Sequence, residues 1–297
     1  MSKIKTYKVR SARLQIGQRL YRRGQHLTEI DLKSVKIDHL LKRGVIELVN
    51  LDLLNLDTPV VSDKNSPKFK KRLAIVTGVW QRPEIFKIFA NQTKKLKHKD
   101  VDIVVIVAGS EGEDSKSMVE KHGFKYIEIR NTPLAHKMNA TTDLAGQYAV
   151  DYVLCVGSDD IISQELFDIY VEQMNKGIDY VAVLDWYFYD TQTDKFAYWG
   201  GYTDKREGHT CGAGRLLSNR LMRLFGWQPW NIEHSHILDD SMQKKLIDIP
   251  HTSYIFKLKD KGVYGIDIKS STNMTPFELW ANTQYIEPTK ELKRCVE

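Results

Sequence analysis

Short apolar runs alternate with amphipathic segments along most of the chain. The apolar runs are rich in β-branched residues, as in strands buried on both faces of a sheet, and they lie at residues 73–77, 101–108, 126–129, 152–156 and 180–184. The segments between them have helical spacing, and the first of these helices is expected to begin at Pro83. Strands that alternate with helices in this way predict an α/β fold with a mostly parallel sheet flanked by helices. In such a sheet, ligands bind in the loops at the carboxyl ends of the strands.

The N-terminal part follows a different pattern. Thr28 precedes an acidic first turn and predicts one short helix, and a second is expected from about Asp38 to Gly44. An alternating strand follows at residues 45–49, and the next twenty or so residues have the composition of a linker. We therefore predict a small α+β domain at residues 1–60, a linker at 61–70 and a larger α/β domain at 71–297.

The positive charge is concentrated in this N-terminal part. Residues 1–50 hold twelve Lys and Arg against four Asp and Glu, a balance of +8, whereas the rest of the chain has a balance of −2. Such a distribution favours an acidic partner, such as nucleic acid or an anionic surface. The alternative is a module that only increases solubility.

Several common classes of protein are disfavoured. The longest purely apolar run, Ile103–Ala108, is far shorter than the ~20 residues that span a bilayer, and no apolar stretch follows the N-terminus, so we expect a soluble, cytoplasmic protein. The three cysteines lack a CxxC spacing, which argues against a disulfide framework. The chain has no GxxxxGK[ST], GxSxG or HExxH motif, and Leu217 stands where a GxGxxG motif would need its third glycine.

Two acidic pairs carry the candidate chemistry. Asp159 and Asp160 follow an apolar strand, where adjacent carboxylates repel each other unless a cation neutralises them. Mg²⁺ or Mn²⁺ with a diphosphate would do so, although Asp160 could instead cap the next helix. Asp239 and Asp240 enter a predicted helix, where they are either caps or a general base for an acceptor hydroxyl.

Other residues have both a binding and a structural interpretation. Gly214 and Arg215 suit an anionic acceptor group, because a glycine lets the backbone approach a ligand and arginine binds anions. Trp230 could form the floor of an acceptor cleft. The aromatic run at residues 186–189 could stack on a sugar but is more typical of strand packing. His234 and His236 have alternating spacing, although a zinc site needs three or four ligands.

From about Lys71 to Ser271, the chain resembles the GT-A (Rossmann-like) fold of family-2-like glycosyltransferases, including phage-type enzymes. Four pieces in the right order carry the resemblance, namely residues 74–84, residues 131–140, Gly157-Ser158-Asp159-Asp160 in the place of a DxD motif, and residues 211–217 followed by Asp239-Asp240. Two departures are visible. Gly157 replaces the first Asp of the DxD motif, and Asp239-Asp240 replaces the usual Glu-Asp pair. A C-terminal histidine ligand has no firm counterpart, His251 being one candidate.

The resemblance implies a metal-assisted, inverting transfer of a sugar from a nucleotide-sugar donor, most simply a UDP-sugar, to an acceptor hydroxyl. Asp239 or Asp240 would be the base, and Asp159 with Asp160 would bind Mn²⁺ or Mg²⁺. The residues implied to bind the donor are Thr77, Trp80, Arg82, Lys137, Asn139, Ser158 and Asp159.

The acceptor and the activity itself leave alternatives open. With its basic N-terminal part, the chain suits a hydroxymethylated base in DNA, and a saccharide, a lipid-linked molecule or a protein is the alternative acceptor. A sugar-1-phosphate nucleotidylyltransferase would need a glycine-rich loop after the first strand, which Thr77-Gly78-Val79-Trp80 lacks. Gly157 is compatible with a third possibility, a catalytically degenerate GT-A domain used only for binding.

Overall fold

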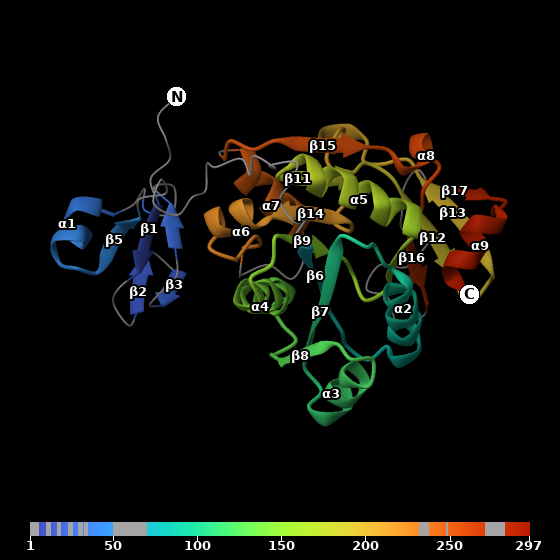
Figure 1. Cartoon of the computed structure of the whole chain (residues 1–297), viewed down its shortest axis with the longest axis horizontal. Helices are drawn as coiled ribbons and strands as arrows, with labels where there is room; N and C mark the ends of the chain where they lie inside the picture. Colours follow the sequence, from blue (N-terminus) through green and yellow to red (C-terminus); the bar gives the residue numbers. More distant parts are fainter. Residues whose placement is uncertain are drawn as a thin grey trace.

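A seven-stranded sheet forms the centre of the larger part of the chain (Figure 1). The computed structural model describes residues 6–9, 13–16, 19–22, 26–28, 32, 35–49, 70–231, 238–247, 249–270 and 283–297. In spatial order the strands are β15 (Ser253–Phe256), β11 (Tyr180–Val183), β14 (Arg215–Ser218), β9 (Tyr152–Cys155), β6 (Lys71–Gly78), β7 (Val101–Gly109) and β8 (Lys125–Glu128). Only β14 runs against its neighbours within this sheet, so the predicted mixed α/β fold with a mostly parallel sheet is confirmed.

Helices cover both faces of this sheet. They are α2 (Pro83–Lys95), α3 (Glu113–Glu120), α4 (Leu134–Ala145), α5 (Gln164–Lys176), α6 (Asn219–Leu224) and α7 (Leu238–Ile247). Successive side chains of β6 point to opposite faces: Leu73 and Ile75 join the core under α2, α3 and α5, whereas Ala74 and Val76 join the core under α4, α6 and α7. A strand covered on both faces must be apolar throughout, which explains the continuous apolar runs in the sequence.

The helix starts agree with the sequence signals. Pro83 is the first residue of α2, where its missing N–H costs nothing. Ser163 caps α5, its Oγ accepting a hydrogen bond from the backbone N–H of Leu166 at 3.2 Å.

A second sheet of five strands was not predicted. Its order is β10 (Asp160–Ile162), β16 (Gly265–Lys269), β12 (Trp186–Asp190), β13 (Lys195–Trp199) and β17 (Thr283–Ile286), and the short helices α8 (Leu258–Lys261) and α9 (Lys290–Val296) complete this region. The aromatic run lies on β12, where Trp186, Tyr187 and Phe188 are buried, so strand packing is the correct interpretation of it.

The N-terminal part has its own small core. Its elements are β1 (Thr6–Val9), β2 (Arg13–Ile16), β3 (Arg19–Arg22), β4 (His26–Thr28), α1 (Ile37–Lys42) and β5 (Ile46–Val49), and the core residues are Tyr7, Leu14, Ile16, Leu32 and Ile46. The second predicted helix and the strand at 45–49 are confirmed. The helix predicted at Thr28 is wrong at that residue, which ends β4, and residues 29–31 lie outside the described residues. The proposed boundary stays a prediction, because residues 50–69 also lie outside them.

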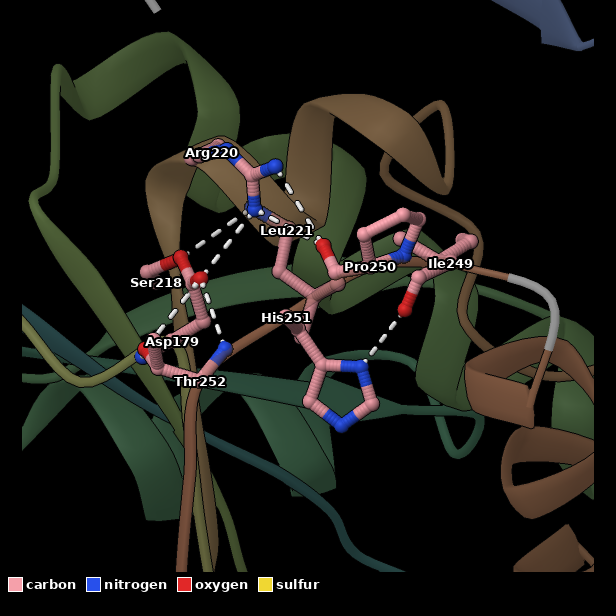
Figure 2. Close-up of polar contacts among 8 residues, drawn as sticks. All are labelled: Asp179, Ser218, Arg220, Leu221, Ile249, Pro250, His251 and Thr252. Carbon is pink, nitrogen blue, oxygen red and sulfur yellow. Dashed lines mark hydrogen bonds and ion pairs between the residues drawn. The ribbon is translucent and has the colours of Figure 1, made fainter. Parts of the chain in front are cut away.

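The amino edge of the large sheet is tied together by Asp179 (Figure 2). One carboxylate oxygen accepts a hydrogen bond from Ser218 Oγ at 2.8 Å, and the other accepts from Arg220 Nη1 at 3.1 Å and from the backbone N–H of Thr252 at 3.2 Å. These partners join the starts of β11 and β15 to the end of β14 and the start of α6. His251 lies at this edge, with Nδ1 2.7 Å from the carbonyl of Ile249.

Within the described ranges, no helix combines the length and the apolar character needed to cross a bilayer.

Candidate functional site at the carboxyl edge of the sheet

The loops after β6, β7 and β8 are joined by one buried lysine. Because these strands are parallel, their loops meet at the same edge. Lys137, on α4 and only 1% exposed, reaches this edge, and its Nζ donates to the carbonyl of Val79 at 2.6 Å, to Ser110 Oγ at 3.1 Å and to Asn131 Oδ1 at 2.9 Å. All three donor positions of its ammonium group are thereby used, so Lys137 holds the loops in place around the site.

Burial changes the proton affinity of this lysine. It lowers the pKa of Lys137 to about 8, with a smaller lowering from Arg82, and the carboxylates of Glu111 and Glu128 act in the opposite direction. The three neutral oxygen acceptors around Nζ compensate only in part for the water that the ammonium group loses on folding.

Arg82 links the first loop to the one after β9. It precedes α2, and its guanidinium group donates from Nη1 to Asp159 Oδ2 at 2.5 Å and from Nη2 to Ser158 Oγ at 3.2 Å. The Arg82 and Asp159 side chains are 18% and 17% exposed, respectively. Three of the residues predicted to bind the donor, Arg82, Ser158 and Asp159, therefore lie together at the carboxyl edge.

A third carboxylate joins the predicted acidic pair. One carboxylate oxygen from each of Asp159, Asp160 and Asp267 lies within 4.8 Å of the others. Asp160 and Asp267 are direct cross-strand partners on β10 and β16, and the backbone N–H of Ile268 donates to the carbonyl of Asp159 at 2.8 Å. Like charges placed directly opposite destabilise a sheet, so this register needs a compensating cation.

The compensation comes from Lys269, from Arg82 and from the backbone. Lys269 Nζ lies 2.5 Å from Asp267 Oδ2, and the N–H of Gly157 donates to Asp160 Oδ2 at 2.5 Å. Burial still raises the pKa of Asp160 well above its ordinary value, and Asp267 and Asp159 raise it further. Burial likewise raises the pKa of Asp267, against the effect of Lys269. Asp267 Oδ1 is buried and has no hydrogen-bond partner among the described residues.

The helix-cap interpretation of Asp160 is wrong. Asp160 belongs to β10, and the residue that caps α5 is Ser163. The glycine that departs from the DxD motif also has a structural reason. A Cβ on Gly157 would lie 2.5 Å from Asp159 Oδ1 and 2.8 Å from Asp160 Oδ2, so the two carboxylates occupy the space that a side chain would need.

The second acidic pair lies in the first turn of α7, as predicted. Asp239 packs against the backbone of Gly212, where a Cβ would lie 2.1 Å from its Oδ1, and Tyr202 Oη donates to its Oδ2 at 3.2 Å. Asp240 faces His209, with Nδ1 and Oδ1 3.8 Å apart. Tyr202 is in turn covered by the guanidinium of Arg206, 4.0 Å from its ring centre.

Carboxylates from both acidic groups act on one buried thiol, that of Cys211. Burial raises the pKa of Cys211 well above its ordinary value, and the carboxylates of Asp185, Asp239 and Asp160 raise it further. Cys211 lies beside the carboxyl end of β11, since its N–H donates to the carbonyl of Val183 at 2.8 Å. The carboxylates of Asp160 and Asp239 therefore belong to the same edge of the sheet.

Arg215 has a different role from the predicted contact with an acceptor. It is 1% exposed, and its three nitrogens donate to the carbonyls of Cys211 (2.8 Å), Thr210 (3.0 Å) and Asp239 (3.2 Å). Gly214 is buried as well: it has φ +74°, and its carbonyl accepts from Tyr170 Oη at 2.7 Å. These residues hold the loop before β14 against the start of α7, which positions Asp239.

Asn139 and Trp230 bind each other. Asn139 Nδ2 donates to the carbonyl of Trp230 at 2.9 Å, and the N–H of Trp230 donates to Asn139 Oδ1 at 3.2 Å, with both residues buried. Their described contacts are thus structural, whereas the sequence suggested donor and acceptor binding.

The remaining predicted residues differ in exposure. Thr77 is fully buried within β6, whereas Trp80 is 44% exposed at the carboxyl edge and is open to a stacking partner. His251 lies at the amino edge, on the opposite side of the sheet from the carboxylates, so it is not placed to complete their site. His234 and His236 lie outside the described residues.

Sequence reasoning missed Asp267 and Tyr202. Asp267 stands within the alternating strand sequence Gly265-Ile-Asp-Ile-Lys269, where an acidic residue followed two positions later by a lysine indicates a paired charge on one strand face. That signal indicates the pair Asp267–Lys269 but does not show that Asp159 and Asp160 lie beside it. Tyr202 carried no signal, because its partner Asp239 is distant in the sequence.

The comparisons with known proteins bear on the fold. No family model and no curated protein matches the chain. Among solved structures, it is similar to residues 1–349 of S. aureus TarS in complex with UDP-GlcNAc, with a TM-score of 0.53 and 13% identity over 68% of this chain and 60% of that chain. For the TarS 1–349 complex with UDP, the TM-score is 0.50 and the identity 13%, over 67% and 61% of the two chains.

The chain therefore spans less than two thirds of the length of these structures. A synthase of 4-diphosphocytidyl-2C-methyl-D-erythritol from Anaerococcus prevotii is a more distant match, with a TM-score of 0.42 and 13% identity over 63% of this chain and 86% of that one. Identities this low speak for the fold alone. With the sheet described above, the two TarS matches show a GT-A-like fold.

The lowered pKa of Lys137 predicts a pH-dependent stability. Between pH 8 and about 10.5, the unfolded chain binds a proton that the folded chain has lost, so this residue makes the free energy of unfolding rise with pH. Replacing Lys137 by Met removes this contribution. We expect the difference in unfolding free energy between wild type and Lys137→Met to grow across that interval, measured by urea denaturation at several pH values. Lys116→Met, at a side chain that is 45% exposed, is the control. A constant difference between wild type and Lys137→Met would contradict the expectation.

Proposed function

We propose that this chain is a glycosyltransferase that moves a sugar from a nucleotide-sugar donor, a UDP-sugar in the first instance, to an acceptor hydroxyl with inversion. The observation that carries the proposal is the meeting of two separate acidic groups at one edge of a GT-A-like sheet. One group, Asp159, Asp160 and Asp267, has the character of a cation and diphosphate site, and the other, Asp239 and Asp240, has that of a general base.

The donor would lie across the loops that Lys137 holds. Trp80 is exposed and can stack on the base, and the guanidinium group of Arg82 has the planar fork that matches a phosphate. Lys137 then acts by fixing the loops, because its three donor positions are already used within the protein.

A divalent cation, Mn²⁺ or Mg²⁺, fits the first acidic group. Hard cations prefer carboxylate oxygens, and Asp267 Oδ1 is a buried oxygen without a hydrogen-bond partner among the described residues. Asp159, Asp160 and Asp267 would hold the ion, which supplies positive charge for a leaving diphosphate. Asp267 comes from β16, so the third ligand takes the place that the resemblance gave to a histidine.

The displacement itself needs a base on the acceptor side. The acceptor oxygen attacks the anomeric carbon and loses its proton to a carboxylate, while the carbon–oxygen bond to the diphosphate breaks and its electron pair leaves with the diphosphate. Asp239 suits this role because Tyr202, Gly212 and the bond from Arg215 to its backbone fix its orientation. Asp240, paired with His209, is the alternative base.

For the acceptor we propose a polyanion, a hydroxymethylated base in DNA. Support comes from the +8 balance of residues 1–50 beside the −2 balance of the remaining chain. A saccharide, a lipid-linked molecule or a protein is the alternative acceptor.

Donor binding should depend on Asp159. We expect isothermal titration with UDP and Mn²⁺ to show binding by the wild type and none, or at least tenfold weaker binding, by Asp159→Asn, because Asp159 lies at the centre of both the arginine contact and the acidic group. Asp168→Asn, an exposed residue of α5, is the control. No binding of UDP, GDP or another nucleoside diphosphate by the wild type would refute the proposed function.

Turnover should depend strongly on Asp239, whereas UDP binding should not. In Asp239→Asn, we expect transfer to an acceptor to fall by about 10²–10⁴-fold with the Kd for UDP unchanged, because only proton removal is lost. Asp240→Asn serves as the comparison that decides between the two carboxylates. Metal-dependent hydrolysis across a panel of nucleotide sugars identifies the donor for this assay. If the wild type binds donors without transfer or hydrolysis, the chain is a catalytically degenerate GT-A domain used only for binding, the alternative with which Gly157 is compatible.

DNA binding should depend on salt through the N-terminal part. For the full chain, we expect log K for binding to duplex DNA to fall linearly with log salt concentration. In a variant, the slope should become shallower by about 0.9 for each phosphate that the protein no longer neutralises. The triple variant Arg19→Gln, Arg22→Gln and Arg23→Gln should show this shallower slope, whereas Lys94→Gln, Lys95→Gln and Lys97→Gln in the larger part should keep the wild-type slope. Equal slopes for both variants would favour another acceptor.

A further inference from the structure

The contact between Arg82 and Asp159 occupies an oxygen that the proposed cation would need. Nη1 of Arg82 lies 2.5 Å from Asp159 Oδ2. A divalent ion bound to that oxygen at about 2.1 Å would compete with the guanidinium group for the same lone pairs and would repel it. Since both side chains are less than a fifth exposed, water screens this repulsion only weakly.

Formal charges lead to the same conclusion. When all three carboxylates are ionised they carry −3, and Lys269, 2.5 Å from Asp267, brings the group to −2. Arg82 alone leaves it at −1, and a divalent ion alone makes it neutral. Both together would leave an excess of +1 in a half-buried site, which is unfavourable unless a further anion enters.

The backbone of Arg82 is fixed, whereas its side chain can exchange partners. The preceding residue, Gln81, has φ +49°, and its N–H donates to Glu111 Oε2 at 3.1 Å, while the carbonyl of Arg82 accepts the N–H of Phe86 at 2.9 Å. The guanidinium group thus stays at the carboxyl edge after leaving Asp159. A diphosphate at that edge offers paired oxygens in the geometry that arginine binds best.

We infer that Arg82 and a divalent cation are alternative partners of Asp159, and that a nucleoside diphosphate promotes cation binding by taking over the guanidinium group. This inference rests on the proposed function. Arg82 is then an internal substitute for the metal that lowers the affinity of the empty site for free cations. In the complex, the same side chain binds the diphosphate, so cation and nucleotide bind cooperatively.

The test is isothermal titration of MnCl₂ into the protein with and without saturating UDP. Because the arginine contact holds part of the population in a state that cannot bind the ion, Arg82→Gln should bind Mn²⁺ alone about tenfold more tightly than the wild type. It should also bind UDP more weakly, and UDP should increase its Mn²⁺ affinity by a smaller factor than in the wild type. Arg72→Gln, which removes an exposed arginine paired with Asp102, is the matched control and should leave all these values unchanged.

A second variant keeps the test independent of any effect on folding. Ser158→Ala removes the hydrogen bond from Nη2 and should tighten Mn²⁺ binding in the same direction by a smaller factor. Equal or weaker Mn²⁺ binding by Arg82→Gln and Ser158→Ala, with binding abolished in Asp159→Asn, would overturn the inference and leave the proposed function standing. Absence of Mn²⁺ binding in wild type and Arg82→Gln, with and without UDP, would overturn both.

Discussion

Mutual repulsion among Asp159, Asp160 and Asp267 is the constraint on which the carboxyl edge depends. Cross-strand pairing of β10 with β16 places two of these carboxylates directly opposite each other, and the backbone bond from Ile268 fixes the third beside them. The fold tolerates this arrangement because Arg82, Lys269 and the N–H of Gly157 each contact one carboxylate. A side chain at residue 157 would meet two of them, so the glycine has a structural reason in the cluster itself.

Lysine and arginine divide the work of organising this edge. The ammonium group of Lys137 donates to neutral oxygens of three loops, and desolvation lowers its pKa. Arg215 likewise donates its hydrogen bonds to backbone carbonyls, and these bonds join the loop before β14 to α7. Arg82, in contrast, points to a carboxylate that remains partly exposed. Buried cations that satisfy backbone groups fix geometry, while a cation paired with a partly exposed acid can exchange its partner.

The sequence predicted the large sheet because each central strand is apolar on both faces and each connection carries a helix signal, as Pro83 and Ser163 show. It also located Asp159, Asp160, Asp239 and Asp240, since acids at strand and helix ends are visible in one dimension. It could not locate Asp267 or Tyr202, which reach the site only through strand pairing and loop packing between distant segments. For the same reason, it assigned Arg215, Asn139 and Trp230 to ligands, although folding turns them toward backbone groups of the protein.

The buried thiol of Cys211 is acted on by carboxylates of both acidic groups. This thiol is buried, and carboxylates from both groups raise its pKa, so each group acts electrostatically on the same point of the core. That point lies next to Arg215, whose charge opposes theirs and whose bond to the backbone of Asp239 places α7. A change in charge at the first group would therefore alter the field at Asp239 through a region with little water to screen it.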